Sequence, residues 1–495
     1  MADSRDASET LTGTATTAES VASHAAERPD AVALIQDGRT ISHAQFSRDI
    51  GKFTAALADL GLPPGSTVAV GCNDIYIHWL LLLAAEQLNV ATAPFGQRED
   101  PEVSADLLAR VDRVLTDAKL GHVAAERQVL ITPEWLRRAF AREPVQSALR
   151  AKRSPGDIIR IVRSSGTTGR PKRLAYTRHM HELRVIRDTE RYRFTRESRY
   201  LLTLGFSVGP HYGYATACLR AGGRIVILAA IDIGVFEKYG ITHVGLTPHL
   251  LKKILDELPA SFVKPASLTI SCAGSALSDE LAERALRLLA TEVIDSFGTN
   301  EIGGISFKRA SLRDSFATVC TGVEVEVVDD SGRPLPSGVP GRLRVRSESL
   351  VAGYLDDPEA TRRFFKDGWF YPSDVAVLDG RRRLKLVGRA DEMITTIGGK
   401  YAPSDLEAGV MAHLGEGDVG VCAFADRDGV ETVYVAIAGT RLGPEELLER
   451  VKQALGTTLV GKFAVVAMGS IPRNAAGKIE RARLKEAVAG TLPRA

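Results

Sequence analysis

Short apolar runs alternate with longer amphipathic stretches through most of the chain, and this alternation is the strongest constraint on its fold. The stretches "PHLLKKILDEL" and "SDELAERALRLLA" space their apolar residues as one face of a helix does. Apolar runs of strand length flank them, namely "STVAVGC" (66–72), "RIVILAAI" (224–231), "THVGLT" (242–247) and "SLTISCAG" (267–274). Strands that alternate with helices predict an α/β fold in which much of the sheet is parallel.

The chain is too long for one hydrophobic core, because it has 495 residues and cores stop growing at roughly 250 to 300. The turn-rich stretch "DSGRPLPSGVPG" (330–341) separates two β-rich runs and predicts a small, mostly antiparallel β unit. We therefore predict a large N-terminal domain of parallel-rich α/β layers plus this unit, and then a small α+β domain. The boundaries are a disordered lead-in over 1–18, the large domain over 19–388, a connection over 389–391 and the small domain over 392–495.

Charge and cysteine usage exclude several classes of function. Lys and Arg total 63 against 61 Asp and Glu, so the formal net charge of +2 gives no global field for nucleic acid or a membrane surface. The five cysteines form no CxxC pair, which favours a reducing compartment over a disulfide framework. The longest apolar run, "WLLLLAA", is too short to span a bilayer, and the N-terminus lacks the pattern of a signal peptide. We expect a cytoplasmic protein.

The loop "SSGTTGRPK" (164–172) follows an apolar run and combines hydroxyls, glycines and a lysine. Such a loop suits polyphosphate, because glycines let the backbone approach closely while amides, hydroxyls and the lysine surround the oxygens. It is not a Walker loop, since Gly166 and Gly169 are only three residues apart and Pro171 precedes Lys172. Taken alone, the loop is equally consistent with a polar surface turn.

Four further motifs follow in a fixed order. The loop itself resembles the S/T-S/G-G-S/T-T-G-x-P-K signature of the adenylate-forming (ANL) superfamily, which includes the acyl-CoA synthetases and aryl-acid:CoA ligases. The other segments that resemble this superfamily are "DSFGTNEIGG" (295–304), "WFYPSDVA" (369–376), "LVGRADEMITTIGGKYAPSDLE" (386–407) and "IPRNAAGKIERARL" (471–484). Five motifs in order are far more specific than any one of them.

The resemblance implies that ATP and a carboxylate react to form an acyl-adenylate, with release of pyrophosphate. The implied β- and γ-phosphate contacts are Ser164, Ser165, Gly166, Thr167, Thr168, Gly169 and Lys172. The implied adenine and nucleotide contacts are Gly274, Ser275, Ser296, Phe297 and Gly298, with Asp374 on the ribose hydroxyls and Arg389 on ribose or phosphate. Glu301 would bind Mg²⁺, Thr299 and Asn300 would donate to the α-phosphate, and Lys478 would bridge the carboxylate and the α-phosphate.

Family members carry out a second half-reaction after the small, mobile domain rotates. By resemblance, Asp391 is the hinge residue, and Gly398 and Gly399 leave room for a phosphopantetheine arm. The implied thiol belongs to coenzyme A or to a separate carrier protein. The hypotheses are a stand-alone carboxylic acid:CoA ligase, an acyl-AMP ligase that loads a separate carrier protein, and a non-catalytic adenylate-binding homologue. Whether the chain forms a homodimer is a question that the sequence leaves open.

The sequence departs from the family pattern at Asn300, where threonine is usual, and at Ser373, where glycine is usual. Ser373 would have to manage without the freedom of glycine at positive φ. Amino-acid-activating relatives carry Phe-Asp where this chain has Phe206 and Ser207, so an α-amino acid is disfavoured. The expected acyl pocket consists of Ser207, His211, Tyr212 and Gly303, and aryl, fatty and polycyclic acids all remain open.

Overall fold

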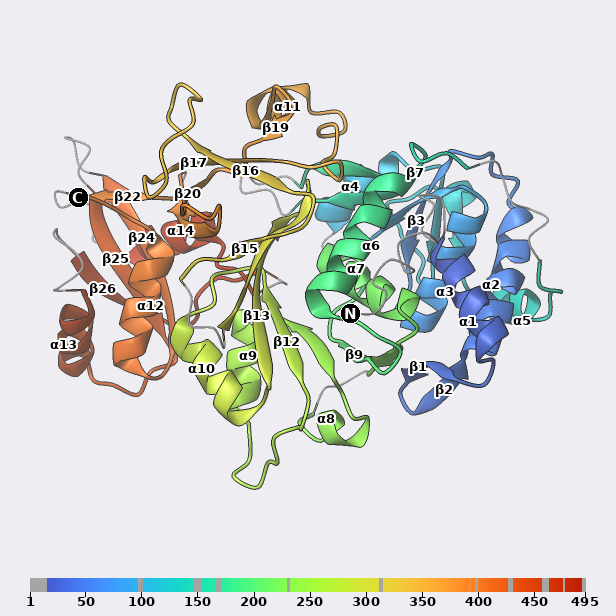
Figure 1. Ribbon diagram of the computed structural model, residues 1–495, viewed down its shortest axis with the longest axis horizontal. Helices are drawn as coiled ribbons and strands as arrows, with labels where there is room; N and C mark the ends of the chain where they lie inside the picture. The colour runs from blue at the N-terminus through green and yellow to red at the C-terminus, as the bar shows by residue number, and fades with distance from the viewer. Residues whose placement is uncertain are drawn as a thin grey trace.

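The computed structural model describes most of the chain in two large sheets, a small sheet and a C-terminal unit. The described residues are 16–96, 99, 101–145, 153–164, 171–228, 232–310, 315–390, 392–396, 399–425, 431–455, 463–474 and 477–491. In Figure 1 the C-terminal unit lies at the left end of the molecule, and the two large sheets follow to its right.

The first large sheet has nine strands in the order β15-β14-β13-β12-β11-β9-β10-β1-β2. Its six central strands are parallel, and antiparallel strands close both edges. In that order they are β15 (Thr318–Val319), β14 (Gly303–Arg309), β13 (Glu292–Thr299), β12 (Thr269–Ala273), β11 (His243–Leu246), β9 (Arg199–Leu202), β10 (Arg224–Ile227), β1 (Val32–Gln36) and β2 (Arg39–Ser42). The predicted strands over 224–231, 242–247 and 267–274 are confirmed, with β10 ending at Ile227.

The second large sheet has six strands, and the predicted strand over 66–72 is its β3. All of its pairings are parallel except that of β7 with β8. Its strands in order are β6 (Gln128–Leu130), β5 (Arg113–Thr116), β3 (Thr67–Gly71), β4 (Ala91–Pro94), β7 (Ile158–Arg163) and β8 (Arg173–Thr177). The loop 164–172 therefore connects the two strands of the antiparallel pair at the sheet edge.

Helices fill the space between the large sheets and cover their outer faces. Helices α6 (Arg178–Tyr192) and α7 (Gly209–Arg220) lie between the sheets, while α9 (Pro248–Asp256) and α10 (Asp279–Leu288) cover the other face of the nine-stranded sheet (Figure 1). The remaining helices of this part are α1 (Thr17–Glu27), α2 (His43–Ala58), α3 (Ile75–Gln87), α4 (Pro101–Ala109), the 3₁₀ turn η1 (Ala125–Arg127), α5 (Pro133–Phe140), α8 (Val235–Lys238) and α11 (Pro358–Phe364).

The lead-in predicted over 1–18 is wrong at its C-terminal end. Helix α1 begins at Thr17, and Thr16 and Glu19 form a reciprocal capping box in which each side chain accepts from the other residue's backbone N–H. The box satisfies two of the N–H groups that a helix start leaves free, which stabilises the helix there. Thr16 and Thr17 are fully buried. Residues 1–15 lie outside the described residues.

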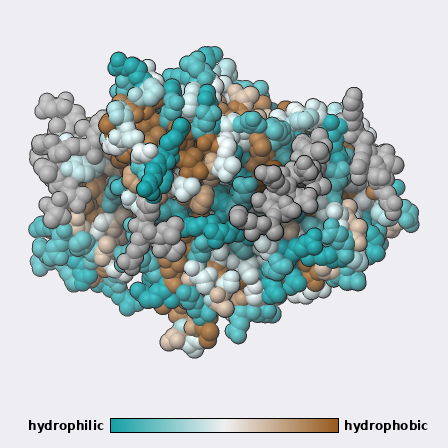
Figure 2. Space-filling view, viewed as in Figure 1, coloured by the Kyte–Doolittle hydropathy of each residue, from teal (hydrophilic) through white to brown (hydrophobic). Residues whose placement is uncertain are grey.

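The predicted β unit is a separate small sheet in the order β18-β19-β17-β20-β21, with β16 paired to β17. These strands are β16 (Glu324–Val328), β17 (Gly341–Arg346), β18 (Phe365–Lys366), β19 (Trp369–Phe370), β20 (Asp374–Leu378) and β21 (Leu384–Arg389). The pairing of β16 with β17 is antiparallel, as the turn-rich connection between them predicts. Figure 2 shows that apolar side chains on this face of the molecule gather mainly over the same small sheet.

The C-terminal unit has a core of its own, formed by buried residues between Ile394 and Leu455. Its strands are β22 (Ile394–Thr396), β23 (Gly399–Tyr401), β24 (Asp418–Ala425), β25 (Glu431–Ala438) and β26 (Phe463–Met468), and its helices are α12 (Pro403–Leu414), α13 (Pro444–Leu455) and α14 (Arg481–Thr491). Strands β24 and β25 are antiparallel, and β26 adds in parallel. In the part of the chain that the structure describes, no helix is both long and apolar enough to cross a bilayer.

Candidate active site

The segment from Thr299 to Glu301 follows the end of β13 and is held in place through its backbone. The Tyr176 hydroxyl donates to the Asn300 carbonyl at 2.7 Å, and Arg184 Nη1 donates to the same oxygen at 3.1 Å. Arg184 Nη2 donates to the carbonyls of Glu301, at 3.1 Å, and Ser349, at 2.8 Å. The Arg184 guanidinium also lies 4.0 Å from the Tyr176 ring centroid. Two residues from β8 and α6 therefore fix the position of the acidic residue.

The Glu301 carboxylate is buried, with 6% of the residue exposed, and Oε1 accepts a hydrogen bond from the Tyr354 hydroxyl at 2.9 Å. Burial and this carboxylate both raise the pKa of Tyr354, so its hydroxyl stays protonated and donates. Lys172 Nζ lies 4.8 Å from the Tyr354 ring centroid and 4.5 Å from that of Phe364. The lysine at the end of the 164–172 loop thus shares the Tyr354 side chain with Glu301.

Thr299 and Asn300 differ in which donors they leave available. Asn300 Nδ2 donates to the Arg163 carbonyl at 2.9 Å, so that part of its amide is already engaged. The Thr299 hydroxyl is buried and has no hydrogen-bond partner among the residues that the structure describes. A buried hydroxyl without a partner is costly, and an anion at that position would relieve the cost. Thr299 is therefore better placed than Asn300 to donate to a phosphate.

Asp374 and Arg389 face each other as a register pair of the antiparallel strands β20 and β21. Asp374 is buried, with 9% of the residue exposed. Its neighbour Ser373 has φ +68°, the left-handed region that glycine normally occupies. The positive φ expected at this position is therefore confirmed, although a serine adopts it. Arg389 Nε lies 3.4 Å from Glu392 Oε1 in the segment that leads to β22.

Lys478 reaches this site from the C-terminal unit. Its Cε lies 3.6 Å from the position that a Cβ would take on Gly274, which has φ +105° at the end of β12. The adjacent Gly477 contacts the rim between β11 and α9, with the Thr247 hydroxyl 3.3 Å and His249 Cβ 3.2 Å from its own Cβ position. Glycine at 274 therefore leaves the space that the lysine side chain occupies.

Opposing charges surround the Lys478 amine. Burial lowers its pKa, and the nearby positive charge of Arg389 lowers it further. The carboxylates of Asp374, Glu392 and Glu301 act in the opposite direction. Acidic and basic groups from β20, β21 and the connections that follow β13 and β21 thus lie within electrostatic reach of one amine, and this amine can neutralise an anion placed among them.

The donor set fits a nucleotide with Mg²⁺. Glu301 offers a buried carboxylate, and Mg²⁺ bound with nucleotides often takes one or two carboxylates together with phosphate oxygens and water. In the described ranges, no group of three or more His, Cys, Asp or Glu side chains could hold a metal ion. A magnesium ion that is held partly by phosphate needs no such group.

Some predicted contacts lie outside the described residues, namely Ser165, Gly166, Thr167, Thr168, Gly169, Asp391 and Gly398. The ends of the phosphate loop are described: Ser164 N–H donates to the Lys172 carbonyl at 2.8 Å, and Lys172 N–H lies 3.3 Å from Ser164 Oγ. Ser275 and Gly298 are exposed, Phe297 is half-buried, and Gly399 lies in β23. The Ser296 hydroxyl is buried and paired with Tyr192 at 3.0 Å.

The four residues expected in the acyl pocket do not share one surface. His211 faces β11, with its Cε1 3.4 Å from the Cβ position of Gly245, and burial lowers its pKa to about 4. Tyr212 is instead in the core, with Arg160 3.7 Å from its ring centroid and His181 stacked on it. Ser207 is exposed, and Gly303 contacts the Arg184 side chain.

Three residues that position the site were not predicted: Tyr176, Arg184 and Tyr354. Each contributes through a hydrogen bond or a ring contact to a segment distant in sequence. Tyr354 follows Gly353 within a "VAGY" stretch, but an isolated tyrosine of this kind carries no pattern. Arg184 lies in a helix rich in charges, which sequence periodicity assigns to a solvent-facing surface.

Comparisons with known proteins identify the family of the chain. A family model described as "AMP-binding enzyme" matches residues 21–355. 4-Coumarate–CoA ligase 3 of Oryza sativa subsp. japonica is 26% identical, over 92% of this chain and 89% of that protein. The fatty acid–acyl-carrier-protein ligase ScoC of Streptomyces coeruleorubidus is 25% identical, over 94% of each chain.

Among solved structures, the anthranilate CoA ligase AuaEII in complex with anthranoyl-AMP has a TM-score of 0.86 at 19% identity. The alignment covers 97% of this chain and 98% of that one. At this identity the likeness concerns the fold alone. Together, the family match and the fold confirm the resemblance to adenylate-forming enzymes that the five motifs predict.

Proposed function

The chain belongs to the AMP-binding enzyme family and is an ATP-dependent, AMP-forming ligase, and from that premise we propose that it is a stand-alone carboxylic acid:CoA ligase. In the first half-reaction, a carboxylate oxygen bonds to the α-phosphorus of ATP while the bond to the pyrophosphate oxygen breaks. In the second, the sulfur of coenzyme A bonds to the acyl carbon, the bond to the AMP oxygen breaks, and the thiol proton leaves to a base or to water.

The observation that carries the proposal is the position of Lys478. Its side chain packs on Gly274, and its charge interacts with Asp374 and Glu301, although more than a hundred residues separate it from each of them. A cation at this place would lie between a carboxylate and the α-phosphate and would offset their mutual repulsion. The two parts of the chain are therefore arranged for adenylate formation.

The other side chains divide the remaining tasks. The Thr299 hydroxyl, which has no partner in the described part of the chain, would donate to an α-phosphate oxygen, and Asp374 would accept from the ribose hydroxyls. Glu301 would hold Mg²⁺, which, when bound, neutralises charge on the phosphate oxygens. Lys172 would approach the departing pyrophosphate from the edge of the second sheet. Tyr354 and Arg184 keep Glu301 in position.

Thioester formation requires Lys478 to leave, because its loop covers the rim of β11 and β12. We propose that the C-terminal unit rotates at Asp391 and that Gly398 and Gly399 then border the pantetheine arm. The acceptor thiol has a second candidate, since ScoC, which is similar over most of its length, is named for an acyl-carrier protein. A direct comparison of coenzyme A with holo acyl-carrier protein as acceptor distinguishes the two.

The first test is ATP–pyrophosphate exchange with Lys478→Ala in the presence of Mg²⁺ and a panel of acids. Exchange should fall by at least about 100-fold, because the variant removes charge stabilisation made in the transition state. Thioester formation from a supplied acyl-adenylate should be largely retained. Lys485→Ala is the matched control, because Lys485 lies on α14 against Phe424, and it should behave as the wild type. Equal loss of both steps in Lys478→Ala would refute the assigned role.

A further inference from the structure

The face of the nine-stranded sheet beneath α6 and α7 carries small residues where most sheets carry large ones. Gly245 and Ser271 are register partners on β11 and β12, and Gly298 pairs with Gly304 across β13 and β14. On the opposite face, alternate residues such as Leu246 and Cys272 pack into the core under α9 and α10. Room for an acyl group can therefore exist only on the side of α6 and α7.

That room is closed a short way below Lys478. Three side chains converge on the Cβ position of Gly245: Tyr200 Oη at 2.8 Å, Tyr214 Cδ2 at 3.3 Å and His211 Cε1 at 3.4 Å. The spaces beside Gly213 and Gly304 are closed by the two members of an ion pair. Asp188 Oδ2 lies 3.2 Å from the Cβ position of Gly213, and Arg191 Nη1 lies 2.5 Å from that of Gly304.

Two independent lengths bound the space between Lys478 and the layer of side chains around Gly245. Thr247 lies at the level of Lys478, and Gly245 is two strand residues below it, a rise of about 7 Å. On α7, Gly209 faces Asn300 near the phosphate end, and Gly213 lies four residues further, about 6 Å along the helix. Both lengths correspond to a single aromatic ring with a small substituent.

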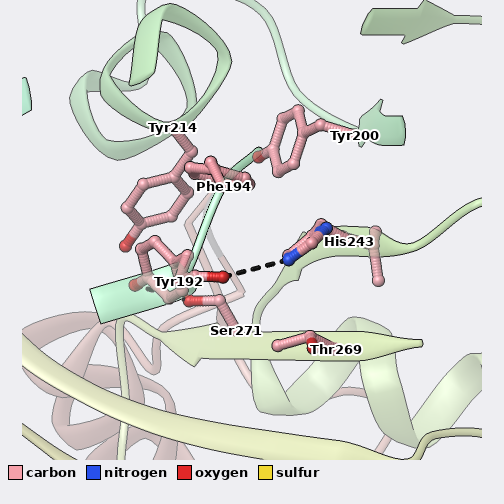
Figure 3. A pocket seen from close by; sticks show the side chains of 8 residues that line it. Tyr192, Phe194, Tyr200, Tyr214, His243, Thr269 and Ser271 are labelled. Carbon is pink, nitrogen blue, oxygen red and sulfur yellow. Dashed lines mark hydrogen bonds between the residues drawn. The ribbon is translucent and has the colours of Figure 1, made fainter. Parts of the chain in front are cut away.

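The layer that closes the pocket is rigidly held. The Ser271 hydroxyl donates to the Tyr192 hydroxyl at 2.8 Å, Ser296 Oγ lies 3.0 Å from the same oxygen, and the Tyr192 and Tyr214 rings pack edge to face at 4.8 Å. Behind this layer lies a cavity of only about 10 Å³, lined by Tyr192, Phe194, Tyr200, Tyr214, His243, Val244, Thr269 and Ser271 (Figure 3). A cavity of this size holds one water molecule and no part of a long acyl chain.

The same layer is polar. Arg191 Nη2 donates to Asp188 Oδ1 at 2.5 Å, and both residues are buried. Among the described residues, the buried Tyr200 hydroxyl and Arg191 Nε meet no partner at ordinary hydrogen-bond geometry, although the Gly245 backbone lies beside the hydroxyl. An alkyl chain pushed into this layer would separate buried charges and leave polar groups without partners, which costs several kcal/mol. A ligand with a polar end would instead supply the Tyr200 hydroxyl with a partner.

We infer that the acid is compact, no longer than one aromatic ring, and carries a hydrogen-bonding group at the end remote from its carboxylate. The inference rests on the proposed ligase function and deepens it by naming the substrate class. Tyr214 and the Asp188–Arg191 pair set the length, and Tyr200 meets the polar end. Long-chain saturated fatty acids and polycyclic acids are excluded as preferred substrates.

The test is ATP–pyrophosphate exchange with benzoate, para-hydroxybenzoate, butyrate, octanoate and a steroid carboxylic acid. The wild type should prefer the compact acids, and kcat/KM for para-hydroxybenzoate should exceed that for benzoate by at least about tenfold. Tyr200→Phe should lower kcat/KM for para-hydroxybenzoate by a larger factor than kcat/KM for benzoate and so remove most of that preference. An unchanged ratio in Tyr200→Phe would overturn the role of the polar end.

Tyr214→Ala should join the pocket to the cavity behind it and raise kcat/KM for octanoate relative to benzoate by at least about tenfold, the effect of about one newly buried methylene. Tyr214→Leu keeps more of the packing and should give a smaller shift in the same direction if the alanine variant folds poorly. Phe194→Leu is the control, because Phe194 lines that cavity but is not among the side chains nearest Gly245, and it should leave the octanoate-to-benzoate ratio unchanged.

The outcomes separate the two proposals. A wild type that prefers octanoate or the steroid acid would overturn the length limit and leave the ligase function intact. An unchanged preference in a folded Tyr214 variant would also overturn it. No exchange with any acid of the panel, in a protein that binds ATP, would overturn the ligase function and with it this inference.

Discussion

Asp295 shows what burial does to a single carboxylate near the site. It lies on β13 and faces away from the α6 side, and burial raises its pKa from 3.8 to about 6 against the opposing charge of Lys308. Because the folded state holds this proton more tightly than the unfolded chain, the resulting stability is fully present below pH 3.8 and is lost as the pH rises through 6. At neutral pH the ionised carboxylate therefore costs stability.

Asp295→Asn should remove this dependence. Relative to the wild type, the free energy of unfolding of the variant should rise by about 2 kcal/mol between about pH 4.5 and about pH 7.5. Urea unfolding at both pH values measures the change. Asp330→Asn is the control, since Asp330 is exposed in the turn after β16, and it should shift both values alike. If the free energies of unfolding of Asp295→Asn and the wild type differ by the same amount at both pH values, Asp295 is not the group with the raised pKa.

At the scale of single residues, the order of the motifs predicted which side chains bring charge to the site. It did not predict which contacts hold those side chains in position. Lys478, Glu301 and Asp374 are brought within electrostatic reach of one another, as the motifs require. The choice between Thr299 and Asn300 depends on the Arg163 carbonyl, which occupies the Asn300 amide. That carbonyl is more than a hundred residues away, so no local pattern contains the answer.

Helix α6 is the element whose sequence pattern differs most from the burial of its side chains. Its sequence is dense in charges, which predicts a solvated face, yet six of its charged or titratable residues are buried: Arg178, His181, Glu182, Arg187, Asp188 and Arg191. The helix lies between the two large sheets (Figure 1), and its charges are paired or donate to backbone carbonyls. Strand positions were predictable because their apolar runs are local, whereas these pairings are not.

This helix holds the backbone of Glu301, the proposed Mg²⁺ ligand, through Arg184. Arg184→Met should raise the Mg²⁺ concentration needed for half-maximal exchange by about 10- to 100-fold, because it frees the carbonyls of Asn300 and Glu301 while leaving the carboxylate itself in place. Arg184→Lys should recover part of the effect. Exchange titrated with Mg²⁺ at saturating acid provides the measurement.

Glu190→Gln serves as the control for Arg184, because Glu190 lies on the exposed side of α6. It should leave the Mg²⁺ dependence unchanged. A lower melting temperature in Arg184→Met with an unaltered Mg²⁺ requirement would assign Arg184 to folding and not to the site.

At the scale of the whole molecule, we propose that the contact between the C-terminal unit and the large sheets serves one half-reaction, adenylate formation. Glu392 connects the two, since its carboxylate lies 3.4 Å from Arg389 Nε and 3.3 Å from Arg481 Nε. Arg481 is in turn paired with Glu407 on α12. These pairs follow directly after position 391, so backbone rotation there would break the Arg389 contact first.

Asp391→Pro should therefore retain pyrophosphate exchange within about threefold and reduce thioester formation by at least about 100-fold, because proline fixes φ and blocks the rotation. Asp391→Ala, which removes the carboxylate and leaves the backbone free, should retain both steps. The two rates are measured separately by exchange and by coenzyme A consumption. Residue 391 lies outside the described residues, and an unimpaired second step in the proline variant would refute the hinge.

The Lys478 loop, seated on Thr247 and His249, has a further consequence for how the enzyme handles its own product. An acyl-adenylate is a mixed anhydride that water destroys, and in the proposed mechanism the loop that assists its formation would also cover it. Release and exposure to water thus depend on the same movement that admits the thiol. Deprived of a thiol, the enzyme should stop after one turnover with the intermediate sealed inside, and supply of the acceptor becomes the control on its consumption of ATP.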